Sequence, residues 1–431
     1  MNFEGLSTGR APPAQAPLLL FSLMPFFLGL TGATLVWQGG DMLVSRWTPG
    51  ILGITHFLVL GVIAPAMCGG LLQLAPVLLD APYTQVQALA QLTTASLGFG
   101  ALAIGGGLLF AQHQLLMAGA LVTLTGLGTF LVATFHALRR AAARRGLLSA
   151  IRIASIALLV TLLLGLTLAL MRAGWIALPL PPQWVNTHLA WGLGGWAGLL
   201  LAGTATQIIP LFHMCPEFPD WFTRGLAHAV GALLCLATVA VLIPGSAPYG
   251  AWILATLLCA HILFHLYALF CEQRRQRPVR EADLWLWQVA HLAVTGALIG
   301  WIFDAPQLSI GILIMGSVLT FLLGSMLKIL PFLTWLDLQQ QRISGQHLQV
   351  RIPRLRQILP STLANLIALS LIYSLLLLLG ATAWPALTQL GGGLLTACAI
   401  LMMVALARAI RIHRQLLLVF QHAGDDLPPH T

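Results

Sequence analysis

The stretch "THLAWGLGGWAGLLLAGTATQIIPLF", residues 187–212, decides the fold. It is long and apolar enough to cross a bilayer as a helix, which takes roughly 20 residues. It nevertheless carries His188 near its start, several glycines, and Gln207 and Pro210 near its end. Glycines let helices approach closely in lipid, and a polar side chain can satisfy the carbonyl that a proline frees. The stretch therefore predicts a membrane-spanning helix packed against other helices.

The composition of the whole chain agrees with this reading. Of its 431 residues, 58% are hydrophobic and only 8% charged, whereas a soluble domain carries about 25% charged residues. We therefore predict an all-α integral membrane protein with twelve transmembrane helices, because barrel strands would alternate polar and apolar residues. The windows are 17–38, 52–79, 86–109, 115–138, 150–171, 184–212, 225–244, 249–271, 284–302, 308–335, 361–381 and 386–409. The first window is longer than a typical signal-peptide core, so we expect it to be retained.

Positive charge is concentrated on one side of the predicted membrane. Of the 21 lysines and arginines, only Arg46 and Arg172 lie in odd-numbered connections, and Lys328 lies inside the tenth window. The others lie before the first window, in or beside even-numbered connections, and at the end of the twelfth window. Cytoplasmic loops carry the excess of positive residues, so both termini are predicted to be cytoplasmic. This distribution explains the net charge of +9 without a nucleic-acid partner.

Three windows share one pattern. The second, sixth and tenth each contain small residues, then a polar residue three positions before a proline, then an acidic residue. The polar residues are Gln73, Gln207 and Lys328, the prolines are Pro76, Pro210 and Pro331, and the acids are Asp80, Glu217 and Asp337. Self-similarity at this spacing predicts a single domain, 1–431, of three pseudo-symmetric four-helix repeats, about residues 1–145, 146–280 and 281–431.

The polar repeat positions have more than one interpretation. Gln73 and Gln207 either mark a functional position or only cap backbone near the cytoplasmic ends of their helices. Lys328, the single lysine of the chain, either extends to the cytoplasmic edge or binds an anion such as a haem propionate.

Histidines inside apolar windows are the leading functional candidates, because ionisable groups in a membrane are costly. His56 and His188 follow a threonine at the start of the second and sixth windows. Equivalent depths on equivalent helices would allow both imidazoles to face one cavity and ligate a haem iron or another metal. The alternatives are hydrogen bonding to backbone carbonyls, or a proton or substrate role.

A second group lies deeper. His261 and His265 are separated by one helical turn in the eighth window, and His291 lies in the ninth. If the two helices are adjacent, the three side chains could form a metal or haem site; the alternative is polar packing between the helices. No acidic residue lies inside these two windows, so a hard metal ion is not expected. The six cysteines are scattered singly and predict neither disulfides nor a zinc ribbon.

Twelve helices in three groups of four, with one histidine on the second and another on the sixth, resemble subunit I of the haem-copper oxidases, whose wider group includes NnrS-like membrane proteins. The resemblance implies that His56 stands where the family ligates a low-spin haem, and His188 nearest to a copper ligand. The sequence departs from the family at Gly192, where the family has a tyrosine. His228 stands alone where a histidine pair is expected, and the tenth helix has no histidine. The resemblance therefore implies the fold without the oxygen-reducing centre.

We expect a haem- or metal-binding protein of a bacterial inner membrane, with haem as cofactor and copper as a second candidate. It would serve electron transfer, sensing or protection against nitrosative or oxidative stress, in contact with lipid and with respiratory or electron-transfer membrane proteins. If it is an enzyme, we expect a haem-dependent oxidoreductase. One alternative is a small-molecule or ion transporter, because repeats, prolines and intramembrane polar residues also suit a permease. Another is a cofactorless assembly partner of a respiratory complex.

Overall fold

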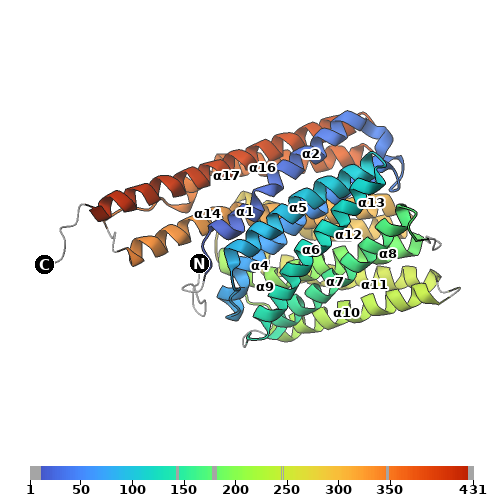
Figure 1. Cartoon of the computed structure of the whole chain (residues 1–431), viewed down its shortest axis with the longest axis horizontal. Helices are drawn as coiled ribbons and strands as arrows, with labels where there is room; N and C mark the ends of the chain where they lie inside the picture. Colours follow the sequence, from blue (N-terminus) through green and yellow to red (C-terminus); the bar gives the residue numbers. More distant parts are fainter. Residues whose placement is uncertain are drawn as a thin grey trace.

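The computed structural model of the chain describes residues 11–141, 145–176, 182–243, 245, 247–345 and 349–425. Within these residues the secondary structure is entirely helical, and Figure 1 shows the helices packed as one bundle. Twelve of its helical stretches are long and apolar enough to cross a membrane, judged by length and composition. The prediction of an all-helical protein with twelve candidate spans is confirmed.

Eight of these spans are single helices, and the first span contains three helical segments in succession. The first span comprises α1 (Gln15–Phe21), α2 (Leu23–Gln38) and the short 3₁₀ helix η2 (Gly39–Val44). The single-helix spans are α5 (Val86–Leu109), α6 (His113–Leu138), α7 (Arg145–Arg172), α10 (Asp220–Leu242), α11 (Ala247–Gln273), α12 (Ala282–Ile302), α16 (Ser361–Gly380) and α17 (Leu387–Asp425). The short helix α15 (Leu355–Ile358) precedes α16. In Figure 1, α17 runs alongside α16 and α2, which brings the first and last spans together.

The second, sixth and tenth spans share a construction that the sequence pattern did not reveal. Each is an α-helix interrupted by a π-helical segment, in which the turn is widened. The second is α3 (Pro49–Leu58), η3 (Val59–Ile63) and α4 (Ala64–Leu79). The sixth is α8 (Pro182–Leu189), η4 (Ala190–Gly198) and α9 (Leu199–His213), and the tenth is α13 (Pro306–Gly311), η5 (Ile312–Leu319) and α14 (Thr320–Ser344). Such π-helical segments often occur at functional sites.

These three spans form the centre of the bundle. Their most apolar windows are 72%, 72% and 67% buried, the highest values among the twelve spans. The segment η5 contacts both η3 and η4, so the widened turns meet at one level. Each span begins at a proline, which suits the first turn of a helix because its missing N–H has no helical partner there. At the start of α3 the Thr48 hydroxyl also accepts a hydrogen bond from the Ile51 amide.

The acidic repeat position of the tenth span joins the first and last spans to the core. Asp337 accepts a hydrogen bond from the Ala14 amide at 3.3 Å, just before α1. Its other oxygen lies 2.6 Å from Nε2 of His413, on α17. The side chains of Asp337 and His413 are mostly buried, at 13% and 8% exposed. One carboxylate therefore links the first, tenth and twelfth spans.

Candidate functional site

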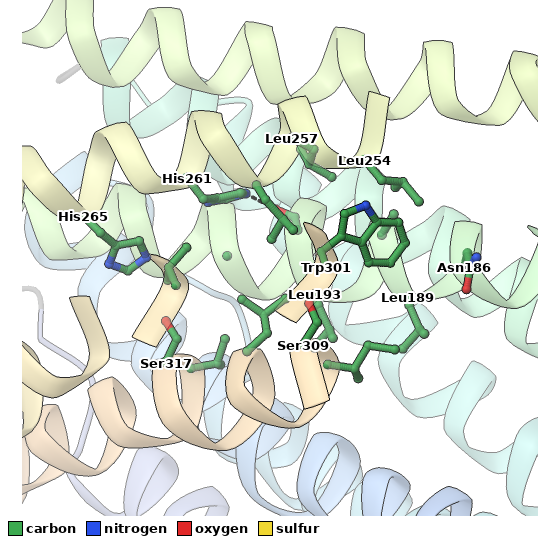
Figure 2. Close-up of a pocket in the computed structure, with 18 of the residues that line it drawn as sticks. Asn186, Leu189, Leu193, Leu254, Leu257, His261, His265, Trp301, Ser309 and Ser317 are labelled. Carbon is green, nitrogen blue, oxygen red and sulfur yellow. Dashed lines mark hydrogen bonds between the residues drawn. The ribbon is translucent and has the colours of Figure 1, made fainter. Parts of the chain in front are cut away.

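A cavity of about 90 Å³ lies between the sixth span, α11, α12 and the start of the tenth span. Most of its wall is leucine, valine, alanine and glycine. Its polar lining residues are Asn186, His261, His265, Trp301, Ser309 and Ser317. Figure 2 shows His265 and Asn186 at opposite ends of the cavity, with His261 and His265 reaching it from α11. The wall of the cavity is therefore mostly apolar, and the titratable side chain of His265 lies at one end of it.

A wider space of about 570 Å³ adjoins the Asn186 end. Both spaces are lined by Asn186, Leu254 and Trp301, so the two are adjacent and share part of a wall. Arg46, in the connection after the first span, also lines this vestibule and donates to Asn186 Oδ1 at 2.7 Å. Burial lowers the pKa of the Arg46 guanidinium from its ordinary value. The vestibule therefore lies beside the apolar cavity, at the end of the bundle where α12 ends.

His261 is held by the π-helical segment of the sixth span. Its Nε2 donates to the Gly194 carbonyl at 3.0 Å, drawn as a dashed line in Figure 2. Because a carbonyl can only accept, the neutral ring keeps Nδ1 unprotonated. Gly198, one turn later in η4, lies directly against the ring. The sequence spacing predicts that His261 shares a site with His265 and His291, but this hydrogen bond ties His261 to η4.

The close approach at Gly198 gives a testable prediction. A Cβ atom added there would lie 2.8 Å from His261 Cε1 and 2.8 Å from the Leu193 carbonyl oxygen, both shorter than a van der Waals contact. We expect Gly198→Ala to displace His261 from Gly194 and to lower stability by about 2 kcal/mol. Thermal unfolding of the detergent-purified protein measures this. The control is Gly225→Ala, where an added Cβ meets nothing within 4 Å; equal losses in the two variants would show that His261 is not constrained as described.

His265, His291 and Glu272 form a continuous buried chain. Nδ1 of His265 lies 2.8 Å from Nδ1 of His291, and Nε2 of His291 lies 3.1 Å from Glu272 Oε1. The three residues are 5%, 2% and 0% exposed, in the order His265, His291 and Glu272. Among the described residues, Glu272 Oε2 has no hydrogen-bond partner. Phe321 packs against His291, with ring centroids 5.8 Å apart, and helps to keep water from the chain.

Glu272 corrects the expectation that no acidic residue accompanies these histidines. The eighth span continues to Gln273, so Glu272 lies inside it, just beyond the end of the predicted window. Glu272 follows His265 by two helical turns, which places both on one helix face. The spacing of His265 and Glu272 could have indicated this shared face from the sequence, but the predicted window 249–271 ends one residue before Glu272. The adjacency of α11 and α12 does bring His265 and His291 together.

The two hydrogen bonds that join His265, His291 and Glu272 have a defined direction. With Glu272 ionised, His291 must donate from Nε2, because a carboxylate only accepts. A neutral His291 then accepts at Nδ1, so His265 donates from its own Nδ1. This leaves His265 Nε2 as an acceptor on a residue that lines the cavity. A proton taken up there can pass through both imidazoles to the carboxylate, because each ring binds a proton on one nitrogen and releases one from the other.

His56 and His188 occupy a different place. His56 Nδ1 donates to the Leu52 carbonyl at 2.8 Å, and His188 Nδ1 donates to the Thr161 carbonyl at 3.1 Å. Both rings are half-buried, and they are near enough to interact electrostatically. Neither lines the cavity, the vestibule or two further pockets found among the described residues. The bonds to backbone carbonyls fit both the hydrogen-bonding alternative and the orientation of a metal-ligating imidazole.

Lys328 is part of a charged cluster at the end of the bundle where α11 ends and α12 begins. It pairs with Glu281 and lies 3.3 Å from Asp283 Oδ1. Asp283 Oδ2 lies 2.7 Å from Nε2 of the fully buried His213. Lys328 therefore has two carboxylate partners, which the sequence pattern did not predict. Both carboxylates lie just outside the predicted window 284–302.

Glu281 is the most shared member of this cluster. Arg277 lies 3.0 Å from its carboxylate and Arg356 2.9 Å, in addition to Lys328. Burial works to raise the pKa of the Glu281 carboxyl, but the hydrogen bonds and charges of the three cations lower it below its ordinary value. A carboxyl whose pKa is lower in the folded state stabilises that state when the pH is above the ordinary carboxyl pKa. This stabilisation is lost as the pH falls through the pKa of the folded state. We expect acid destabilisation that is weaker in Glu281→Gln, measured as unfolding temperature against pH.

The other two polar repeat positions are uncharged glutamines, Gln73 and Gln207. Gln73 is buried, and its Oε1 has no partner among the described residues. Gln207 donates from Nε2 to the Thr206 hydroxyl at 3.0 Å. Within the described residues, no group of three or more histidine, cysteine, aspartate or glutamate side chains is placed to hold a metal ion.

Comparison with known proteins adds no family to these observations. No protein-family model matches the chain, and no curated protein matches it either.

Proposed function

We propose that the chain is a membrane transporter that moves a small solute together with a proton. The observation that carries this proposal is the chain His265–His291–Glu272, which begins at the wall of the cavity and ends on a buried carboxylate. Buried ionisable residues inside a membrane protein typically mark proton or substrate pathways. The position of the vestibule beside the cavity supports a solute path that meets the proton path at His265.

The size and polarity of the cavity limit the solute. An engineered cavity of about 150 Å³ holds benzene, so a cavity of about 90 Å³ has room for on the order of four heavy atoms. The lining is mostly hydrocarbon, and a lone charge would be costly there. We therefore infer a solute that is neutral inside the cavity, with one polar group that reaches His261 or His265.

The direction of transport follows from the charges of the chain. The arginines after α11 and before α16 favour a cytoplasmic location for that end of the bundle. In this orientation the vestibule opens on the opposite side, and a proton taken up at His265 moves toward the cytoplasm. Its arrival neutralises Glu272 and leaves both imidazoles neutral with reversed hydrogen bonds. Because Glu272 is fully buried, this end of the bundle must open to release the proton to cytoplasmic water, and tautomer exchange in both imidazoles then restores the starting state.

Solid-supported membrane electrophysiology on proteoliposomes tests the proposal. Acetamide, 1-propanol and acetone are suitable probes, because each is neutral, carries one polar group and is about as large as the cavity allows. We expect one of them to produce a pH-dependent current that empty liposomes lack and that His265→Ala abolishes. Absence of current with every one of these probes in correctly folded protein would refute proton-coupled transport of such a solute.

A second candidate function is haem binding by His56 and His188. It is favoured by one observation: both rings donate from Nδ1 to a backbone carbonyl, which leaves Nε2 as the metal-facing nitrogen. The donor set fits haem iron, and a bound haem would supply one-electron chemistry. The resemblance to haem-copper oxidase subunit I points the same way, and the shared construction of the second, sixth and tenth spans supports a threefold repeat. The cavities described above contain neither ring, so side chains between them would have to move.

An absorption spectrum of the detergent-purified protein tests the second candidate. We expect a Soret band that His56→Ala or His188→Ala removes while His265→Ala leaves it unchanged. Protein expressed with sufficient haem that shows no such band, and contains no iron or copper, would exclude it.

A further inference from the structure

A pocket of about 280 Å³ lies at the basic end of the bundle, outside the proton and solute paths. It is bounded by the segment before α12, the start of α12, the middle of α14, α15 and the start of α16. The helices that form it come from the last third of the chain. It lies at the edge of the apolar spans, because α12 begins at Ala282 and α16 at Ser361.

The charged lining of this pocket is not balanced. Four cations line it, namely Arg277, Arg280, Lys328 and Arg356, against two carboxylates, Glu281 and Asp283. Lys328 pairs with both carboxylates, and Glu281 also binds Arg277 and Arg356. One carboxylate is thus divided among three cations. Within the part of the chain described, no carboxylate pairs with Arg280, so the pocket carries an excess of positive charge.

The remaining wall is apolar. Trp285, Leu327, Leu359 and Ala364 line the pocket beside the charged groups. Trp285 belongs to the first turn of α12, at the level where tryptophan is commonly found between headgroups and hydrocarbon. A soluble anion would use only the charged part of this pocket. An amphiphile with a phosphate at one end would use both parts.

We propose that this pocket binds the phosphate of an anionic phospholipid from the adjacent leaflet. Arg280 and Arg356 contact the phosphate, because both are exposed and Arg356 has donors beyond the one given to Glu281. The glycerol and the first part of an acyl chain lie along Trp285 and Leu327. Basic pockets between helices on the cytoplasmic side recognise acidic headgroups in this way. The proposal does not depend on the transport proposal, because none of these residues lines the cavity or the vestibule.

Native mass spectrometry of the full chain, titrated with dioleoyl phosphatidylglycerol, measures the binding. Dioleoyl phosphatidylcholine and inorganic phosphate are parallel ligands. We expect phosphatidylglycerol to bind more tightly than phosphatidylcholine, and Arg280→Gln and Arg356→Gln each to weaken it about fivefold. The matched control is Arg351→Gln, an exposed arginine of the preceding connection that does not line the pocket.

Three results would overturn the proposal. The first is equal affinity for the two lipids, and the second is equal loss in the control and the pocket variants. The third is complete displacement of phosphatidylglycerol by inorganic phosphate at the concentration at which phosphate alone binds the protein. That result would assign the site to a free anion. Unfolding temperatures of the variants are measured in parallel. Arg280→Gln remains informative if Arg356→Gln fails to fold, because none of the described carboxylates pairs with Arg280.

Discussion

Replacing Glu272 with glutamine is expected to reduce the solute-driven proton current at least about a hundredfold, the lower end of the range for loss of a positioned proton acceptor. The substituted side chain would still accept from His291 Nε2 through its amide oxygen, so the hydrogen bond of 3.1 Å can be retained. An amide cannot take up the proton, and the pathway then ends on a cationic imidazole in an apolar surrounding. The loss is therefore expected in the current and not in the folding of the protein.

The comparison that isolates this effect is Glu272→Gln against Glu217→Gln. Glu217 is exposed in the connection between α9 and α10 and lines none of the described pockets. Currents are normalised to the amount of reconstituted protein. A Glu272→Gln current equal to that of wild type would show that the proton does not reach this carboxylate.

Asp283→Ala is expected to be the most damaging substitution for stability. Asp283 binds the buried His213 and lies against Lys328, and the side chains of the His213–Asp283 pair are 0% and 3% exposed. Removing one member of a buried pair leaves the other without compensation, which costs about 3 kcal/mol or more. His213 also packs edge-on against Trp287, with centroids 5.2 Å apart, so its displacement would disturb the start of α12.

The unfolding temperature of detergent-purified protein measures this loss. Asp283→Asn keeps an acceptor for His213 and is expected to lose less than Asp283→Ala. Glu217→Ala, at an exposed position, is expected to change little. A fall no larger for Asp283→Ala than for Glu217→Ala would mean that the cluster contributes nothing measurable to folding.

The sequence predicts the membrane helices well because apolar length is a local property. All twelve windows correspond to candidate spans, and the three patterned windows correspond to the three most buried spans. The prolines and small residues of those windows indicate close packing correctly. The threefold repeat and the cytoplasmic location of the termini stay predictions.

The parts that escaped prediction depend on distant contacts or on helix ends. Glu272 and Asp283 lie at the boundaries of apolar windows, where a hydropathy pattern cannot say whether a carboxylate turns inward. The bond from His261 to Gly194 depends on the π-helical turn of η4, for which the sequence carries no recognised signal. The contact of His265 with His291 was expected from adjacent antiparallel helices, but its orientation, Nδ1 to Nδ1, was not.

Infrared difference spectroscopy tests the central claim most directly, namely that solute and proton meet at the chain from His265 to Glu272. A protonated carboxyl absorbs in a region separate from the amide bands, so the protonation of Glu272 is observable in the intact protein. The probe that produces a current is added to membranes at constant pH. The proposal predicts a new carboxyl band that shifts in heavy water and is absent in both Glu272→Gln and His265→Ala. A band that persists in Glu272→Gln, or a transported probe that produces no carboxyl band at all, would contradict it.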